Sequence, residues 1–113
     1  MHEMALVSGI FNILNEKIHE LNLRRINKIN LKVGDMVGVD DKTLKACFEV
    51  FAESTPAEDA ELEIEHIPLR GKCGNCEMEF LLSNYRFQCP YCTESAIKII
   101  SGKGLYIESI EAE

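Results

Sequence analysis

Four cysteines, arranged as two Cys-x-x-Cys pairs, are the residues of this sequence best suited to chemistry. The first pair is Cys73 and Cys76, the second is Cys89 and Cys92, and the twelve residues 77–88 separate them. Two intervening residues let the backbone turn around an ion, so four thiolates with this spacing can close a tetrahedron around one Zn²⁺. We therefore predict that these four cysteines bind one structural zinc ion.

Two other interpretations of these cysteines are a pair of disulfides and a dithiol redox site. Disulfides need an oxidising compartment, whereas no apolar secretory stretch follows Met1, and we expect a cytoplasmic protein. A redox site would use one Cys-x-x-Cys pair and leave the other without a role. The fifth cysteine, Cys47, falls on the apolar face of an expected helix, so we predict a buried thiol.

The amino terminus offers a second metal site of different chemistry. The Met1 amine, the amide nitrogen of His2 and its imidazole Nδ1 can close adjoining chelate rings on one ion. Glu3 could add its amide nitrogen or its carboxylate. Deprotonated amide nitrogens suit square-planar Ni²⁺ or Cu²⁺ better than Zn²⁺, and because the donors must lose protons, affinity should fall with pH. On residue type alone, a terminal histidine without a function is the stronger interpretation.

The hydrophobic periodicity predicts two helices and several strands around these residues. Spacings of three and four give an apolar face to residues 4–21, and to a second helix that starts at Asp40 or Asp41 and ends near Ser54. Alternation predicts strands at residues 29–33, 60–67, 97–100 and 105–110. The strand at 60–67 has an acidic face, expected to be solvated, and places His66 on its apolar side, where we expect it to be packed or near a domain junction.

These patterns also predict which side chains are buried. The expected buried residues are Met4, Leu6, Val7, Ile10, Phe11, Ile13, Leu14, Ile18 and Leu21 in the first helix; Leu44, Cys47, Phe48 and Phe51 in the second; and Phe80, Leu81, Leu82 and Phe87 in a small cluster beside the cysteines. His19, late in the first helix, is expected at the surface, opposing the helix dipole.

Composition limits the classes of function. The chain has 113 residues, 46% of them hydrophobic and 27% charged, which is typical of one small globular domain, or two. No apolar run reaches the roughly 18 residues that cross a bilayer, so we expect no membrane association. A net charge of −7 argues against a nucleic-acid partner. The alternative function, a zinc-ribbon adaptor for nucleic acid or transcription proteins, would need a basic face, yet Arg86 is the only basic residue between Cys73 and Cys92.

Several of these features together resemble one family. They are Met1-His2-Glu3-Met4 opening an amphipathic helix, Val33-Gly34 ending a strand, Asp40-Asp41-Lys42 starting a second helix that contains Phe48-Glu49, and the doubled Cys-x-x-Cys. This order is similar to that of the HypA family, nickel metallochaperones of nickel–iron hydrogenase maturation. The resemblance implies an α+β fold: a three-stranded sheet with two helices at residues 1–68 and 103–113, and a four-cysteine zinc-ribbon domain at residues 69–102.

The same resemblance implies a function and its residues. His2 corresponds to the family's essential nickel ligand, with Glu3 and Asp40 as neighbours in nickel handling. Some members add a nickel-binding histidine near the zinc domain, but neither His19 nor His66 clearly matches it. The implied partners are a nickel-binding GTPase and the hydrogenase large subunit, and the protein is expected to be a monomer or weak homodimer. It would carry Ni²⁺, keep a structural Zn²⁺ and catalyse no reaction.

Overall fold

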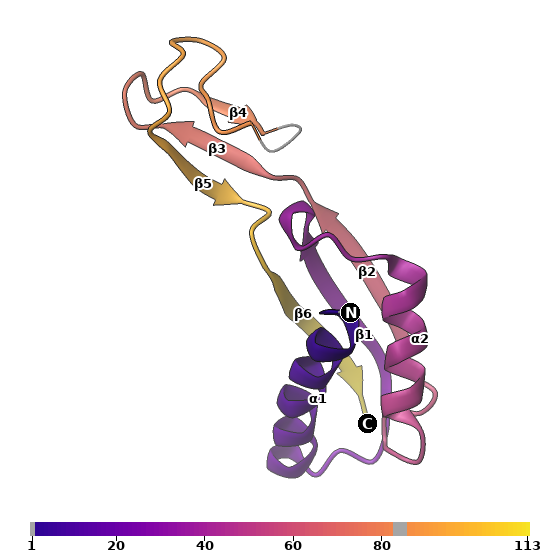
Figure 1. The fold of residues 1–113 in the computed structure, drawn as a ribbon. Coiled ribbons are helices and arrows are strands. Elements are labelled where there is room, and N and C mark those ends of the chain that lie inside the picture. Colours follow the sequence, from indigo (N-terminus) through magenta and orange to yellow (C-terminus); the bar gives the residue numbers. More distant parts are fainter. Residues whose placement is uncertain (1, 83–85) are drawn as a thin grey trace. The chain divides into compact units, whose positions relative to one another are not determined.

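The computed structural model describes residues 2–82 and 86–113, with His2 described by its backbone only. The elements in chain order are α1 (His2–Leu21), β1 (Ile26–Gly34), the 3₁₀ turn η1 (Asp35–Val37), α2 (Asp41–Ala52), β2 (Glu61–Ile67), β3 (Arg70–Cys73), β4 (Glu79–Leu81), β5 (Ile97–Ser101) and β6 (Leu105–Ala112) (Figure 1). No described helix is both long and apolar enough to cross a membrane. The predicted α+β fold class is confirmed.

The chain divides into two compact units. We call the first the helical unit, which comprises Met1–Lys32, Val39–Glu65 and Tyr106–Glu113. The second, the cysteine unit, comprises Val33–Gly38 and His66–Leu105. Each unit is described below by itself.

The first helix buries a narrower stripe than the sequence pattern predicted. Its fully buried apolar residues are Val7, Ile10, Phe11 and Leu14. Three expected core residues are instead substantially exposed: Met4 at 41%, Ile13 at 47% and Leu21 at 60%. A helix in this unit packs on only one side, so the apolar residues at the margins of a wide stripe remain in solvent. The buried stripe begins with the acidic residue Glu3 rather than with Met4.

The second helix begins where the sequence placed it. Asp40 is its N-cap, because the Asp40 side chain accepts a hydrogen bond from the Thr43 N–H. Leu44, Cys47 and Phe48 are buried as predicted. The helix ends at Ala52, slightly before the predicted end near Ser54, whose φ of +61° is left-handed and incompatible with a continuing helix.

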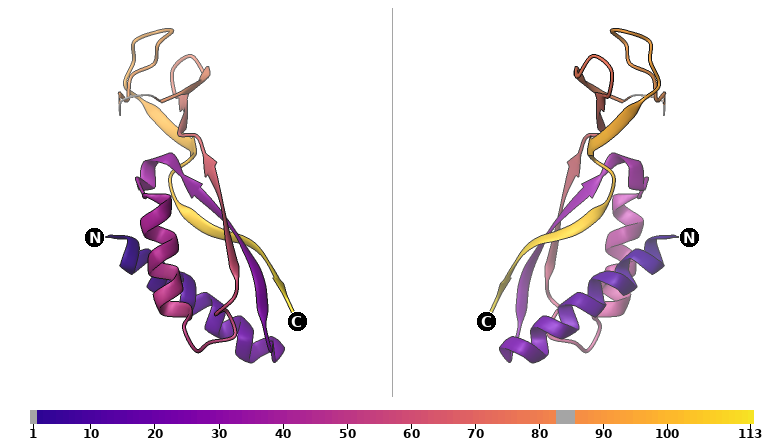
Figure 2. Two further views of the ribbon diagram at one scale, coloured as in Figure 1. Left: turned by 90° about the vertical axis from the view of Figure 1, so that its right-hand side faces the viewer. Right: turned by 90° about the vertical axis from the view of Figure 1, so that its left-hand side faces the viewer.

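Aromatic rings join the two helices. The Phe11 ring centroid of α1 lies 5.1 Å from that of Phe48 and 5.8 Å from that of Phe51, both on α2. Such pairs add a directional attraction to the area that they bury. They hold α1 and α2 together on one face of the first sheet (Figure 2).

The first sheet has strand order β2-β1-β6. Ile29 and Leu31 of β1 and Leu62 of β2 are buried, which confirms the predicted alternation. On the opposite face the acidic side chains of β2 are exposed and paired: Lys28 Nζ lies 3.7 Å from Glu63 Oε1, and Lys32 Nζ lies 2.6 Å from Glu65 Oε2. The glutamates of both pairs are exposed to solvent, which limits what the pairs contribute to stability.

The cysteine unit contains a second sheet, with strand order β4-β3-β5. Both neighbours of β3 run antiparallel to it, with Gly71 opposite Phe80 in β4 and opposite Ile99 in β5. The sequence analysis identified β5 but not β3 or β4. The core of this unit is formed by Leu69, Cys73, Phe80, Leu82 and Cys89, with Met36, Cys92, Ile97 and Ile99 partly buried against it.

Two predicted core positions of the cysteine unit are corrected by the structure. Leu81 is 61% exposed and Phe87 is 38% exposed, whereas Phe80 and Leu82 are buried. In a strand, successive side chains point to opposite faces, so Leu81 of β4 cannot share the core with Phe80. His66 was expected either to be packed or to lie near a domain junction. Its side chain is 47% exposed, with Nδ1 4.0 Å from Asp35 Oδ1, and it is the residue at which the chain passes from the helical unit to the cysteine unit, as the second alternative predicted.

Glycines let separate stretches of backbone meet within the cysteine unit. The Gly34 N–H donates to the Gly104 carbonyl at 2.8 Å, and the Met36 N–H donates to the Gly102 carbonyl at 3.0 Å. A Cβ on Gly34 would overlap the Gly102 carbonyl, and Gly102 itself has a φ of +81°. This junction therefore requires glycine at both positions.

Candidate metal centre

Two loops of the cysteine unit bring the four predicted cysteines together. All four Sγ atoms lie within 4.8 Å of one another. Cys73 Sγ is 3.5 Å from Cys92 Sγ, and Cys76 Sγ is 3.6 Å from Cys89 Sγ. All four side chains are free thiols rather than disulfides. Each close contact therefore joins one cysteine from each Cys-x-x-Cys pair.

Both Cys-x-x-Cys loops have the same backbone conformation. In residues 73–78 the Cys73 N–H donates to the carbonyl five residues later, and the N–H of Glu77 donates back to the Cys73 carbonyl. In residues 89–94 the same two bonds are made by Cys89 and Thr93. Glu77 and Thr93 also share a left-handed φ, +63° and +65°. The matching loops give the four thiols an approximate two-fold arrangement.

Backbone N–H groups point at the sulfur atoms. The N–H of Asn75 donates to Cys73 Sγ, and the N–H of Tyr91 donates to Cys89 Sγ, each at 3.4 Å. The second cysteine of each pair receives the same kind of bond from the residue two positions later. N–H donors favour thiolate over thiol, which is the form that binds metals.

The pKa values of Cys76 and Cys92 are shifted in opposite directions. Hydrogen bonds from the Glu94 N–H and the Asn75 side chain lower the pKa of Cys92 to about 7. At Cys76 the Met78 N–H also lowers the pKa, but burial and the hydrogen bonds with the other thiols outweigh it and raise the pKa to about 12. Four sulfurs this close cannot all ionise without a nearby cation. The arrangement is suited to a metal ion that supplies that charge.

The spacing of the sulfurs fits one small tetrahedral ion. With metal–sulfur bonds of about 2.3 Å, the sulfurs of a regular tetrahedron lie about 3.8 Å apart. The two close Sγ–Sγ distances, 3.5 and 3.6 Å, are near this value. Cys73 and Cys89 are 0% and 1% exposed, whereas Cys76 is exposed. The chain thus has a four-cysteine metal site that is mostly enclosed by its own small core.

The predicted amino-terminal site is described in part. Met1 lies outside the described residues, and His2 is described only as the first residue of α1. Glu3 is 8% exposed, and its Oε2 accepts a hydrogen bond from the Asp40 N–H at 3.4 Å. The structure therefore brings together two of the residues that the resemblance grouped, although 37 positions separate them in the sequence.

Thr43, which the sequence analysis did not single out, holds the side chain of Asp40. The Thr43 N–H and the Thr43 hydroxyl both donate to Asp40 Oδ2, at 3.0 and 2.7 Å. These bonds, above all that of the hydroxyl, lower the pKa of Asp40. An Asp followed three residues later by Thr at a helix start is the signal that could have identified Thr43.

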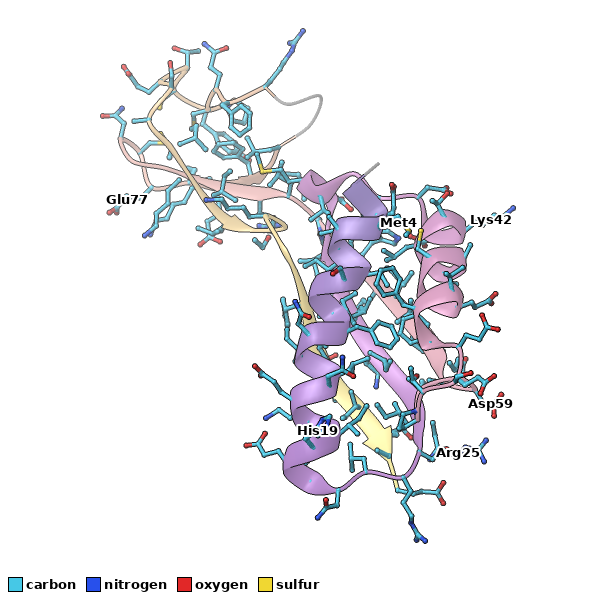
Figure 3. All side chains as sticks on the ribbon, turned by 60° about the horizontal axis from the view of Figure 1, so that its bottom comes forward. Met4, His19, Arg25, Lys42, Asp59 and Glu77 are labelled. Carbon is cyan, nitrogen blue, oxygen red and sulfur yellow. The ribbon has the colours of Figure 1, made fainter. Side chains whose placement is uncertain are left out.

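The position of His19 shows whether it could be a further nickel ligand. His19 lies near the opposite end of α1, about 25 Å from residue 2 at 1.5 Å of rise per residue. Figure 3 shows His19 at one end of the helix pair, and Met4 and Lys42 at the other. His19 therefore cannot join His2 on one metal ion in the same chain. It is exposed as predicted, and its Nδ1 lies 2.8 Å from the Asn15 carbonyl.

Comparison with known proteins identifies the family. Residues 1–112 match the family model described as "HypA: Hydrogenase/urease nickel incorporation, metallochaperone, hypA". The chain belongs to the HypA family. It is therefore a metallochaperone of hydrogenase nickel incorporation that contains a four-cysteine metal site. Partners in the pathway of hydrogenase maturation follow from this role.

Curated relatives match over their whole length. The hydrogenase maturation factor HypA of Desulfitobacterium hafniense (strain DSM 10664 / DCB-2) is 34% identical, covering 100% of this chain and 99% of its own. That of Pelodictyon phaeoclathratiforme is 35% identical, covering 100% and 97%. The solution structure of the nickel metallochaperone HypA from Helicobacter pylori has a TM-score of 0.73 at 24% identity, covering 99% of this chain and 97% of that one. At this identity the likeness supports the fold.

Proposed function

We propose that this protein binds Ni²⁺ at its amino terminus and delivers it during maturation of nickel–iron hydrogenase. A structural Zn²⁺ is held by the four cysteines. The metals divide by function: the zinc is resident and the nickel is cargo. The observation that carries the nickel part is that α1 begins at His2, beside a Glu3 carboxylate that is anchored to the loop before α2.

The start of a helix supplies main-chain donors at no structural cost. The first N–H groups of a helix have no intrahelical acceptor, and those of His2 and Glu3 are among them. Exchange of their protons for a metal ion breaks no hydrogen bond of the helix. The positive end of the helix dipole also favours loss of these protons. Together with the Met1 amine and the His2 imidazole, they form the nitrogen donor set that square-planar Ni²⁺ prefers.

The four cysteines are the donor set of a closed structural zinc site. Cys73, Cys76, Cys89 and Cys92 would together hold Zn²⁺ with no position left for a substrate. A Zn²⁺ ion held there would offset two of the four thiolate charges and would supply no redox chemistry. Four reduced thiolates also favour a reducing compartment, so we place the protein in the cytoplasm.

Delivery follows from the different strengths of the two sites. A short amino-terminal donor set, partly main chain, can release nickel to a partner, whereas four thiolates that converge on one ion retain zinc. We propose a nickel-binding GTPase of hydrogenase maturation and the hydrogenase large subunit as the partners. The helical unit is then the nickel domain, and the cysteine unit is the zinc domain.

A nickel titration of the zinc-loaded protein tests this proposal. We expect tight binding of one Ni²⁺, with the absorption bands of a square-planar complex. Both His2→Ala and addition of one residue before Met1 should abolish this binding, while one zinc per chain remains. Normal nickel uptake by the extended protein would exclude the amine as a ligand. Retention of tight nickel binding by His2→Ala would overturn the amino-terminal site.

A further inference from the structure

Thr43, in the first turn of α2, holds the side chain of Asp40 in place. Thr43 makes two hydrogen bonds to the same carboxylate oxygen of Asp40, from its N–H at 3.0 Å and from its hydroxyl at 2.7 Å. Two bonds to one oxygen set the rotation of the Asp40 side chain as well as its position. A single N–H bond, as in an ordinary helix cap, would fix it less.

The main chain of the same aspartate is bound to the start of α1. The Asp40 N–H donates to Glu3 Oε2 at 3.4 Å, and Glu3 is 8% exposed. A carboxylate buried to this extent needs polar partners, so its place depends on the position of Asp40. The contacts therefore run from Thr43 to Asp40 and on to Glu3, the residue that follows His2. Figure 3 shows Met4 and Lys42, which adjoin Glu3 and Thr43 respectively, at the same end of the helix pair.

We propose that Thr43 is a positioning residue for nickel binding, acting through Asp40 and Glu3 on the first turn of α1. This inference rests on the amino-terminal nickel site proposed above. Main-chain donors bind a square-planar ion only when adjacent nitrogens lie in one plane, so the backbone of residues 2 and 3 must be held. Glu3 holds this backbone through its buried side chain, and Thr43 keeps Asp40, the donor of the hydrogen bond to Glu3, in place. Loss of an outer partner of this kind typically weakens metal binding by about tenfold or more.

Thr55, three residues after the last residue of α2, provides a matched control. Its hydroxyl donates to the Ala52 carbonyl at 2.6 Å and accepts from the Ala57 N–H at 3.1 Å. Like Thr43, it makes two local hydrogen bonds at a terminus of α2. It does not contact Asp40 through either bond. Thr55→Val should therefore affect the stability of the helical unit without affecting the amino-terminal site.

The test is a titration of zinc-loaded full-length variants with Ni²⁺ alone, followed by calorimetry and by the absorption spectrum. We expect Thr43→Val to bind nickel about tenfold more weakly than the wild type. Thr43→Ser, which keeps both donors, should bind like the wild type, and so should Thr55→Val. If Thr43→Val does not fold, Thr43→Ala removes the same hydroxyl without the added methyl group.

The outcomes separate this inference from the proposed function. Wild-type affinity in Thr43→Val, or an equal loss in Thr55→Val, would overturn the positioning function of Thr43. If these results accompany loss of binding in His2→Ala, the amino-terminal site stands and only the inference fails. If His2→Ala binds nickel normally, both fail. A loss in Thr43→Val that Thr43→Ser restores supports the inference.

Discussion

At the scale of residues, Glu3 and Asp40 carry carboxylates of similar chemistry but with different surroundings. The Glu3 carboxylate is buried and accepts from a backbone N–H. The Asp40 carboxylate is exposed and serves as the N-cap of α2, held by Thr43. The sequence analysis left open whether Asp40 or Asp41 is the cap, and the structure assigns it to Asp40. Any function of Asp40 in nickel handling is therefore additional to a structural one.

The titration of Asp40 gives a prediction about pH. Hydrogen bonds from Thr43 lower the folded-state pKa of Asp40 below 3.8, its ordinary value. The stabilisation is therefore complete above pH 3.8 and is lost as the pH falls through the lower folded-state pKa. We expect Asp40→Ala to destabilise α2 at pH 7, and expect its deficit relative to the wild type to shrink at the lowest pH values.

Hydrogen exchange of the α2 amides can measure this effect separately from acid loss of the metal at the cysteines. Asp40→Asn is the control, because asparagine is also a good N-cap but does not titrate. A deficit of Asp40→Ala that stays constant down to pH 2 would show that the Asp40 carboxylate contributes no pH-dependent stability.

At the scale of elements, short strands in the cysteine unit depend on their neighbours. β3 and β4 have four and three residues, too few to show a clear alternation in the sequence. They form because β3 pairs with β4 and β5 at once, and because its backbone passes close to other chain segments at glycines. Gly71 is one example, since a Cβ there would lie 2.7 Å from a methyl carbon of Ile97.

Gly34 provides the prediction at this scale. A Cβ on Gly34 would overlap the backbone of Gly102, which cannot move aside as a flexible side chain could. Gly34→Ala should therefore lower the free energy of unfolding of the cysteine unit by about 1–3 kcal/mol, measured by urea denaturation of the zinc-loaded protein. Gly104→Ala is the matched control, because nothing lies within 4 Å of a Cβ there and φ is not left-handed. Equal stability of the two variants would contradict the close approach.

At the scale of the whole molecule, the two units have different sources of stability. The helical unit buries apolar residues from both helices and from the strands β1 and β2. Among the residues that the structure describes, the core cluster of the cysteine unit has five buried members, and two of them, Cys73 and Cys89, belong to the metal site. A core this small supplies little free energy of folding by itself, so metal binding must supply much of it.

Removal of the metal should therefore affect the units unequally. Under reducing conditions, a strong chelator should abolish hydrogen-exchange protection at residues 69–101 while the amides of α1 and α2 stay protected. Cys76→Ala should reproduce this pattern without a chelator. Cys47→Ala, which removes a buried thiol outside the metal site, should keep one zinc per chain. Full hydrogen-exchange protection of the cysteine unit in the metal-free protein would show that this unit does not need the metal to fold.

The sequence alone determined the features that depend on local spacing. The paired Cys-x-x-Cys spacing indicated the metal site, and periods of two and of three to four residues located β1, β2, β5, β6 and both helices. Such patterns work because a residue's place on a helix or strand follows from backbone geometry alone. The first four residues with the cysteine motif also indicated the family.

Only the tertiary structure decided which residues of each face are covered and which distant groups meet. It exposed Met4 and buried Glu3, since the extent of a buried stripe depends on the neighbouring elements rather than on the helix itself. It also joined Glu3 to Asp40. A contact across 37 positions has no signature in local sequence, because it forms only when both helices pack on the same face of one sheet.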